Sequence, residues 1–211
     1  MTRNVSTAVM QRRVEPHDSL DDFPTPPWAT RALCQWIGPR TITASVREPT
    51  ANRGYMAAVL DEFFYEVEAS DIFDYGAGFA VRDYLFGPVD DTHWTIFNPP
   101  FRLALQFILR ALETSQLGVA AIVRTSFLEG VGRYHDLFSA SPPTDILQFT
   151  ERVVMHKGRL SAKGSTATSY CWLVWDKARP ACAPRFHWIP PCRRALEAPG
   201  DYEGREGSAC H

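Results

Sequence analysis

Apolar side chains recur at helical spacing in several segments of the chain. The segment DDFPTPPWATRALCQWI begins as a proline-rich turn and continues as a predicted helix, and further helices are predicted over residues 55–64, 102–112 and 130–138. The residues expected to face the core are Ala29, Leu33, Trp36 and Ile37 in the first helix, Met56, Val59, Leu60 and Phe63 in the second, and Leu105, Ile108, Leu109 and Leu112 in the third. Each helix therefore has one apolar side that must pack against another layer.

Short runs rich in β-branched and apolar residues separate these helices and predict strands. The predicted strands cover residues 41–47, 66–70, 93–97, 118–124, 146–155 and 169–176. Alternating helices and strands indicate an α/β fold with a parallel sheet covered on both faces, and the last two strands should form a hairpin-like pair. Ligands bind such sheets at the carboxyl ends of the strands, where Glu48, Asp71 and Asn98 are expected.

The length of the chain, 211 residues, fits one domain with small appendages. Residues 1–22 are polar without a clear period and are interpreted as a flexible N-terminal arm. Residues 23–180 carry the predicted fold. Residues 181–211 contain several prolines and charges, and we expect them to pack on the surface or to be partly disordered.

Composition narrows the class of protein. At 45% apolar and 22% charged residues the chain is globular, and no apolar run reaches the roughly 18 to 20 residues of a membrane span. The N-terminus lacks the apolar stretch of a secretory signal, so we expect a cytoplasmic protein without a membrane partner. The five cysteines form no CxxC pair. Although Cys182, His187, Cys192, Cys210 and His211 could in principle meet at a metal, their irregular spacing favours reduced structural thiols and no metal site.

The net charge of −2 does not by itself indicate a nucleic-acid-binding protein. It conceals basic clusters at Arg12–Arg13, in residues 152–163 and at Arg193–Arg194. Such clusters are usually solvated surface, and a phosphate contact is the alternative for each of them.

The tetrapeptide NPPF, residues 98–101, has unusual local chemistry. Prolines fix φ near −65° and donate no backbone hydrogen bond, so Pro99 and Pro100 end the preceding strand. The residue before a proline is also restricted, which stiffens the backbone at Asn98. One interpretation is that Asn98 caps the next helix and Phe101 belongs to the core. The other is that the stiff backbone presents the Asn98 amide to a ligand.

Four motifs in order then suggest a family. EPTANRGYM (48–56), ASDI (69–72), RDYLF (82–86) and NPPF, preceded by FPTPPWAT, resemble class I S-adenosylmethionine-dependent methyltransferases of the amino-methylating branch. Residues 22–194 are similar above all to small phage or prophage DNA N6-adenine methyltransferases. The resemblance implies a Rossmann-like, mostly parallel sheet with helices on both faces and an antiparallel terminal strand. It also implies a cytoplasmic location, in a bacterial host or a phage-infected cell.

The resemblance implies roles for particular residues. Asn98 and the carbonyl of Pro99 would accept hydrogen bonds from the target amine, with Pro100 stiffening the loop and Phe101 stacking on a flipped base. The residues implied in S-adenosylmethionine binding are Thr25, Pro26, Glu48, Pro49, Asn52, Gly54, Asp71, Asp83 and Tyr84. Asn52 stands where the family usually has glycine. Asparagine tolerates the left-handed backbone region, so the turn can survive this departure.

The acceptor is not fixed by NPPF, which also occurs in enzymes that methylate RNA guanine or a protein glutamine amide. The N-terminal position of FPTPP and a basic loop between the last strands favour DNA. The residues expected to contact nucleic acid are Lys157, Arg159, Lys163 and Tyr170. A chain of this length leaves no room for a separate recognition domain, so specificity would come from loops, the arm or a homodimer, without an endonuclease partner. A catalytically inactive cofactor- or DNA-binding module is the remaining alternative.

Overall fold

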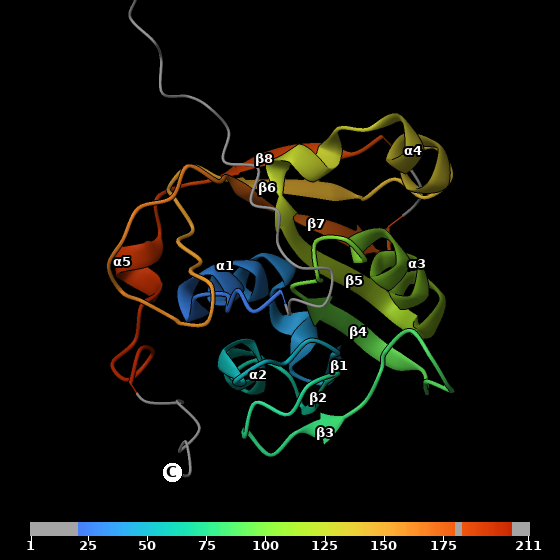
Figure 1. The fold of residues 1–211 in the computed structure, drawn as a ribbon. Coiled ribbons are helices and arrows are strands. Elements are labelled where there is room, and N and C mark those ends of the chain that lie inside the picture. Colours follow the sequence, from blue (N-terminus) through green and yellow to red (C-terminus); the bar gives the residue numbers. More distant parts are fainter. Residues whose placement is uncertain (1–20, 180–182, 204–211) are drawn as a thin grey trace, which may run out of the picture.

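The computed structural model describes residues 21–179 and 183–203. Within them, eight strands form one sheet in the order β3-β2-β1-β4-β5-β7-β6-β8 (Figure 1). The strands are β1 (Ser45–Glu48), β2 (Glu66–Asp71), β3 (Ala80–Val81), β4 (Thr92–Phe97), β5 (Ser115–Arg124), β6 (Asp145–Phe149), β7 (Tyr170–Asp176) and β8 (Arg185–Ile189). The first part of this order, 3-2-1-4-5, is that of a doubly wound sheet.

Every strand pair is parallel except the two that involve β7. This strand lies between β5 and β6 and runs antiparallel to both of them. The prediction of a mostly parallel sheet with an antiparallel strand is therefore confirmed, as is the hairpin-like pairing of the last two predicted strands, but the antiparallel strand is not the terminal one. The antiparallel strand comes late in the sequence but lies inside the sheet.

Helices cover both faces of the sheet (Figure 1). The helices are α1 (Pro27–Ile37), α2 (Tyr55–Asp61), α3 (Ala104–Thr114), α4 (Val131–Arg133) and α5 (Arg193–Leu196). The first two pack on one face and α3 packs on the other. Along β5, Ala120 and Ile122 point to the first face while Val119 and Ala121 point to the second, as expected for a strand buried on both sides.

Several predicted element boundaries were wrong. The strand predicted over residues 41–47 begins only at Ser45, because Pro39–Thr41 form a 3₁₀ turn. The strand predicted to reach Met155 ends at Phe149, and the helix predicted over residues 130–138 is a single α-helical turn followed by a π-turn.

One predicted core residue lies elsewhere. The side chain of Trp36 is 38% exposed, and its ring lies 4.4 Å from the ring of His187. The buried side of α1 runs through Ala29, Leu33 and Ile37 at intervals of four residues, and Trp36 lies at the edge of that stripe. Trp28, Thr30 and Cys34 are buried beside this stripe, whereas Trp36 lies outside the buried side and packs against the edge strand of the sheet.

The C-terminal segment, predicted to pack only on the surface or to be partly disordered, supplies a strand of the sheet. Strand β8, beyond residue 180, pairs in parallel with β6 and forms an edge of the sheet. Its burial pattern is weak, with Phe186 and Trp188 exposed, so the local sequence gave no strand signal. Most of the predicted arm, residues 1–20, lies outside the described residues, as do Arg12, Arg13, Cys182, Cys210 and His211.

Trp172 should be the most sensitive side chain of the core. It lies fully buried in β7, and its Nε1 donates a hydrogen bond to the carbonyl oxygen of Ala29 in α1 at 3.0 Å. We expect Trp172→Ala to lower the free energy of unfolding by about 3–5 kcal/mol in urea titrations. The matched control is Trp188→Ala. The side chain of Trp188 is 66% exposed, so its removal should change the free energy of unfolding by less than about 0.5 kcal/mol. Equal losses in the two variants would contradict this description of the core.

Candidate active site

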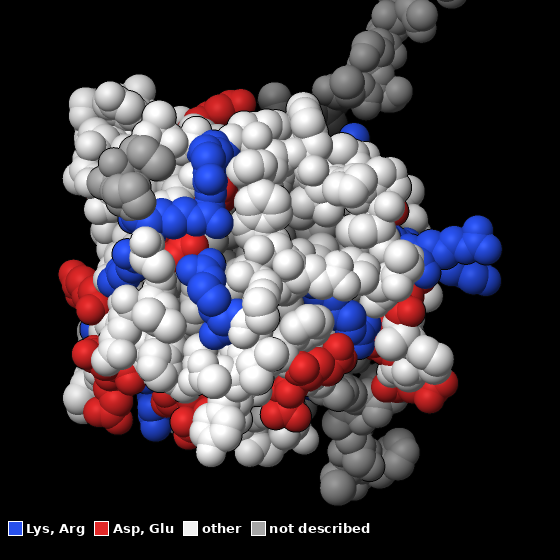
Figure 2. All heavy atoms as spheres, turned by 180° about the vertical axis from the view of Figure 1, so that it is seen from behind, with Lys and Arg blue, Asp and Glu red and all other residues white. Residues whose placement is uncertain are grey.

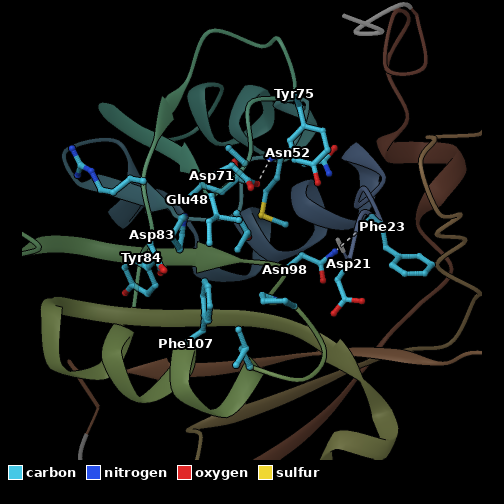
Figure 3. A pocket seen from close by; sticks show the side chains of 18 of the residues that line it. Asp21, Phe23, Glu48, Asn52, Asp71, Tyr75, Asp83, Tyr84, Asn98 and Phe107 are labelled. Carbon is cyan, nitrogen blue, oxygen red and sulfur yellow. Dashed lines mark hydrogen bonds between the residues drawn. The ribbon is translucent and has the colours of Figure 1, made fainter. Parts of the chain in front are cut away.

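A cavity of about 690 Å³ opens at the carboxyl ends of β1, β2 and β4 (Figure 3). Its volume lies within the roughly 300–1,000 Å³ typical of small-molecule sites. The residues predicted from the sequence that line it are Thr25, Glu48, Pro49, Asn52, Asp71, Asp83, Tyr84, Asn98 and Pro100. The parallel sheet thus gathers side chains that are up to 75 residues apart in the sequence.

The turn after β1 has the backbone that the motif predicts. Asn52 has φ of 51° and is the one non-glycine residue with positive φ in the described ranges, while Gly54 has φ of 80°. The left-handed conformation expected for Asn52 is therefore confirmed. The Asn52 backbone N–H donates a hydrogen bond to Oδ2 of Asp71 at 2.8 Å, which joins the turn to the end of β2.

Of the acidic residues that line the cavity, Glu48 is almost fully buried and Asp71 is half-buried. Glu48 is 2% exposed, and its Oε2 has no hydrogen-bond partner. Burial, and then the negative charge of Asp71, raise the pKa of Glu48 well above its ordinary value. Burial likewise raises the pKa of Asp71. The hydroxyls of Thr25 and Thr50 are also buried without partners, so the walls of the cavity offer unused hydrogen-bonding groups.

The RDYLF segment forms another part of the wall. Oδ1 of Asp83 accepts a hydrogen bond from the Leu85 backbone N–H at 2.9 Å, which fixes the carboxylate at the cavity. Tyr84 is 3% exposed and its ring packs 5.3 Å from that of Phe107. Tyr84 therefore joins the cavity wall to the core.

The amide of Asn98 has a defined orientation. Its Nδ2 donates a hydrogen bond to the carbonyl oxygen of Phe23 at 2.8 Å and lies 3.8 Å from the sulfur of Met155 (Figure 3). With the nitrogen engaged, the side-chain oxygen is the group left to a ligand in the cavity. The alternative role as a helix cap is wrong, because α3 begins only at Ala104 and its N-cap residue is Leu103.

The other predicted residues of these motifs lie around the cavity rather than in its wall. Pro26 and Gly54 are the N-cap residues of α1 and α2. Phe101 lies between two neighbours: its ring is 5.2 Å from that of Phe23, and the guanidinium carbon of Arg124 lies 3.7 Å above it. Pro99, between Asn98 and Pro100, is not among the lining residues.

The basic loop between β6 and β7 begins beside Asn98 and is joined to the segment before α1. Beyond Met155, the Gly158 backbone N–H donates to the carbonyl oxygen of Asp22 at 2.8 Å. The predicted phosphate contacts Lys157, Arg159 and Lys163 are exposed on this loop. Figure 2 shows the face behind that of Figure 1, where basic side chains lie among acidic ones, so no field of a single sign covers that face.

Tyr170 does not belong with these surface residues. Its side chain is 4% exposed within the core cluster, and burial raises its pKa. The prediction that it contacts nucleic acid is corrected, because inward-facing positions of a strand buried on both sides are closed to a polymer.

Sequence reasoning missed several residues of the site. Asp21, Phe23, Tyr75 and Arg102 line the cavity as well, and the guanidinium carbon of Arg53 lies 5.0 Å above the ring of Tyr75. The acidic pair directly before FPTPP was the available signal for Asp21, but it fell within the predicted arm. Nothing in the local pattern marked Tyr75, since it lies in an irregular loop after β2.

Known structures share this fold. No protein-family model and no curated protein matches the sequence. The methyltransferase subunit of a type I restriction-modification system from Streptococcus thermophilus superposes with a TM-score of 0.60 at 11% identity, over 82% of this chain and 48% of that one. The 23S rRNA methyltransferase ErmE gives 0.52 at 12% identity, over 76% and 71%.

A third structure was solved with ligands. The 1,6-didemethyltoxoflavin-N1-methyltransferase of Burkholderia thailandensis, with its toxoflavin precursor and S-adenosylhomocysteine bound, gives a TM-score of 0.51 at 14% identity, over 71% of this chain and 76% of that one. The chain has the class I S-adenosylmethionine-dependent methyltransferase fold. It spans about half the length of the restriction-modification subunit. No helix within residues 21–179 and 183–203 is long and apolar enough to cross a membrane.

Glu48 should make the ligand-free protein less stable as pH rises. A carboxyl whose pKa is higher in the folded state holds its proton more tightly there, so the free energy of unfolding falls as pH rises from about 4.5 towards the folded-state pKa. Glu48→Gln cannot ionise and should lose this part of the pH dependence. Between pH 5 and pH 8, the Tm of the wild type should fall relative to that of the variant by roughly 2–4 °C for each kcal/mol involved.

The control is Glu66→Gln, an exposed glutamate in β2, which should keep the pH dependence of the wild type. Identical pH profiles for Glu48→Gln and the wild type would show that the buried carboxyl carries no such penalty.

Proposed function

We propose that this protein transfers a methyl group from S-adenosylmethionine to the exocyclic N6 amine of adenine in DNA, with the target base flipped out of the helix. The observation that carries the proposal is the orientation of Asn98. Because its Nδ2 is held by the Phe23 carbonyl, the cavity receives the side-chain oxygen. An oxygen that only accepts hydrogen bonds selects an acceptor group that carries N–H, as an aromatic amine does.

The cavity suits the proposed cofactor. The unpartnered, buried Oε2 of Glu48 would accept a hydrogen bond from the cofactor's ammonium group, Asp71 from the ribose hydroxyls and Asp83 from the adenine amine, with Thr25 and the Asn52 turn around the methionine portion. A cation beside Glu48 would offset the cost of burying its charge. When bound, S-adenosylmethionine supplies an electrophilic methyl group.

Asn98 and Pro99 would prepare the amine for reaction. The nitrogen lone pair of adenine N6 is delocalised into the ring and is a weak nucleophile. Two acceptors, Asn98 Oδ1 and the Pro99 carbonyl, would hold both N–H bonds and turn the lone pair out of the ring plane. The prolines keep these acceptors rigid. The amine need not lose a proton before transfer, so the site requires no strong general base.

Phe101 would supply the stacking surface for the flipped base. Stacking on an aromatic ring contributes roughly 1–3 kcal/mol per base. One face of the Phe101 ring carries the Arg124 guanidinium, which is exposed to solvent. A base that stacks on this face has to displace the guanidinium, which is then free to turn towards a phosphate.

DNA is the favoured acceptor, and RNA is the second candidate. The basic loop carrying Lys157, Arg159 and Lys163 begins beside Asn98 and so offers phosphate contacts next to the amine site. The likeness to a restriction-modification subunit supports DNA, and the likeness to ErmE motivates the RNA alternative. Both likenesses concern the fold, so the choice depends on experiment.

The test offers the cofactor with a labelled methyl group to genomic DNA, total RNA and a protein mixture in separate reactions. Nucleosides from each nucleic acid are then separated and identified by mass spectrometry. N6-methyladenine in the DNA supports the proposal. Label found only in RNA or only in protein would show that this molecule, and not DNA, is the acceptor. If calorimetry shows cofactor binding but no acceptor becomes labelled, the protein is a non-catalytic binding module.

Asn98→Ala should remove most turnover and leave the cofactor site intact. Loss of one preorganised hydrogen-bonding group in a catalytic site costs about 10²–10³ in kcat. We expect a fall of this size in methyl transfer, while calorimetry with S-adenosylhomocysteine gives a Kd within about threefold of the wild type. An Asn98→Ala protein that methylates at the wild-type rate would refute the assignment.

The double variant Lys157→Ala, Arg159→Ala should weaken DNA binding chiefly at low salt. Each phosphate contact releases about one counterion, so the plot of log Kd against log salt concentration should lose a slope of about 2. Fluorescence anisotropy with a labelled duplex at several salt concentrations measures this slope. An unchanged slope would place the DNA on another surface.

A further inference from the structure

The tripeptide Asp21–Phe23 contacts three segments around the cavity: the NPPF tetrapeptide, the turn after β1 and the basic loop. The carboxylate of Asp21 accepts a hydrogen bond from the Phe101 backbone N–H at 2.7 Å, and the Phe23 carbonyl accepts one from Asn98. Both contacts end on the NPPF tetrapeptide, about 75 to 80 positions further along the chain. Figure 3 shows Asp21 and Asn98 side by side at the end of β4.

The next residue, Asp22, joins the cofactor side. Its Oδ1 accepts hydrogen bonds from Nδ2 of Asn52 and from Nη1 of Arg53, both at 2.8 Å. Its backbone carbonyl accepts the N–H of Gly158 in the basic loop. The side chains of Asp22 and Arg53 are only 13% and 20% exposed, so their ion pair is largely shielded from solvent.

The hydrogen bond of Asp21 matters for the position of the NPPF loop because the two prolines leave few backbone donors there. Pro99 and Pro100 have no N–H, so Phe101 carries the first backbone donor after Asn98. The next one that bonds within this loop belongs to Leu103, whose N–H donates to the carbonyl oxygen of Pro100. The Asp21 carboxylate therefore holds the first backbone N–H beyond the two prolines, while the Asn98 side chain is held by the Phe23 carbonyl.

We propose that Asp21 is a positioning residue for the acceptor loop and that Asp22 ties this loop to the cofactor turn. This inference rests on the proposed function, since it assigns Asn98 to the acceptor amine. Asp21 would act through the Phe101 backbone N–H, which it holds, and so through the loop that carries Asn98. Displacing the Asn98 oxygen by about 1 Å would cost on the order of a hundredfold in rate, because reacting groups must be aligned closely.

The same tie explains why asparagine replaces glycine at position 52. A glycine would adopt φ of 51° easily, but it has no side chain to reach Asp22. The Asn52 amide makes that link while its backbone N–H holds Asp71. The departure from the family motif is thus a connection between the two halves of the site.

The experiment compares Asp21→Ala with Asp21→Asn in the full chain. The asparagine keeps a side-chain oxygen that can accept the Phe101 N–H, and the alanine does not. We expect Asp21→Ala to lower kcat for DNA methylation by about tenfold to a hundredfold, with KM for DNA and Kd for S-adenosylhomocysteine within about threefold of the wild type. Asp21→Asn should retain at least about a third of the wild-type kcat. The control Asp61→Ala, an exposed acid at the end of α2, should match the wild type.

Hydrogen exchange provides a readout that does not require turnover. In Asp21→Ala the peptide containing Phe101 should exchange at least tenfold faster than in the wild type, and in Asp21→Asn it should not. Unchanged exchange in Asp21→Ala, or equal losses of kcat in the alanine and asparagine variants, would overturn the positioning role. If the wild type methylates no DNA, the proposed function fails, while the exchange result still decides whether Asp21 holds the loop.

Asn52→Gly tests the tie through Asp22. We expect faster exchange in the peptide that contains Phe23, because the glycine keeps the turn but lacks the side chain that reaches Asp22. Exchange identical to the wild type would show that the Asn52–Asp22 contact does not couple the two sides.

Discussion

The parallel pairing of β1 with β2 on one side and β4 on the other is the constraint on which the site depends. Parallel strands point their carboxyl ends the same way, so the residues that follow them meet at one edge of the sheet. Glu48, Asp71 and Asn98 reach one cavity for this reason. Both faces of the sheet are packed by helices, which holds the strand ends at a fixed spacing.

This geometry carries an electrostatic cost. It places Glu48 in a nearly dry position close to the Asp71 carboxylate, and both pKa values rise. A structural role alone would favour a partner for such a group, yet Oε2 of Glu48 has none within the described residues. Buried acceptors that remain unpaired at a cavity are typical of a functional site. The core formed by the sheet and helices supplies the stability that offsets this cost.

The fold alone does not determine which molecule would receive the methyl group. The structures that share this fold include proteins described as methylating rRNA and a small molecule, so the fold leaves the acceptor open. The geometry of the present site is set by local contacts. The Phe23 carbonyl turns the Asn98 amide so that its oxygen is available, and Asp21 fixes the backbone beyond the two prolines. A chain segment before the first helix thereby determines which group of the Asn98 amide is left without a bond to the chain.

The sequence by itself determined the alternation of elements, the strand ends that carry the site, and the left-handed turn at Asn52, because hydrophobic period and turn chemistry are local properties. It could not place β8, whose exposed aromatic residues lack a strand pattern, nor show that the ring of Tyr170 faces the core. Only the tertiary structure decided that Asp21 and Phe23 hold the NPPF loop. Those contacts join residues 75 to 80 positions apart, and a hydrogen bond of that range leaves no period in the chain from which it could be inferred.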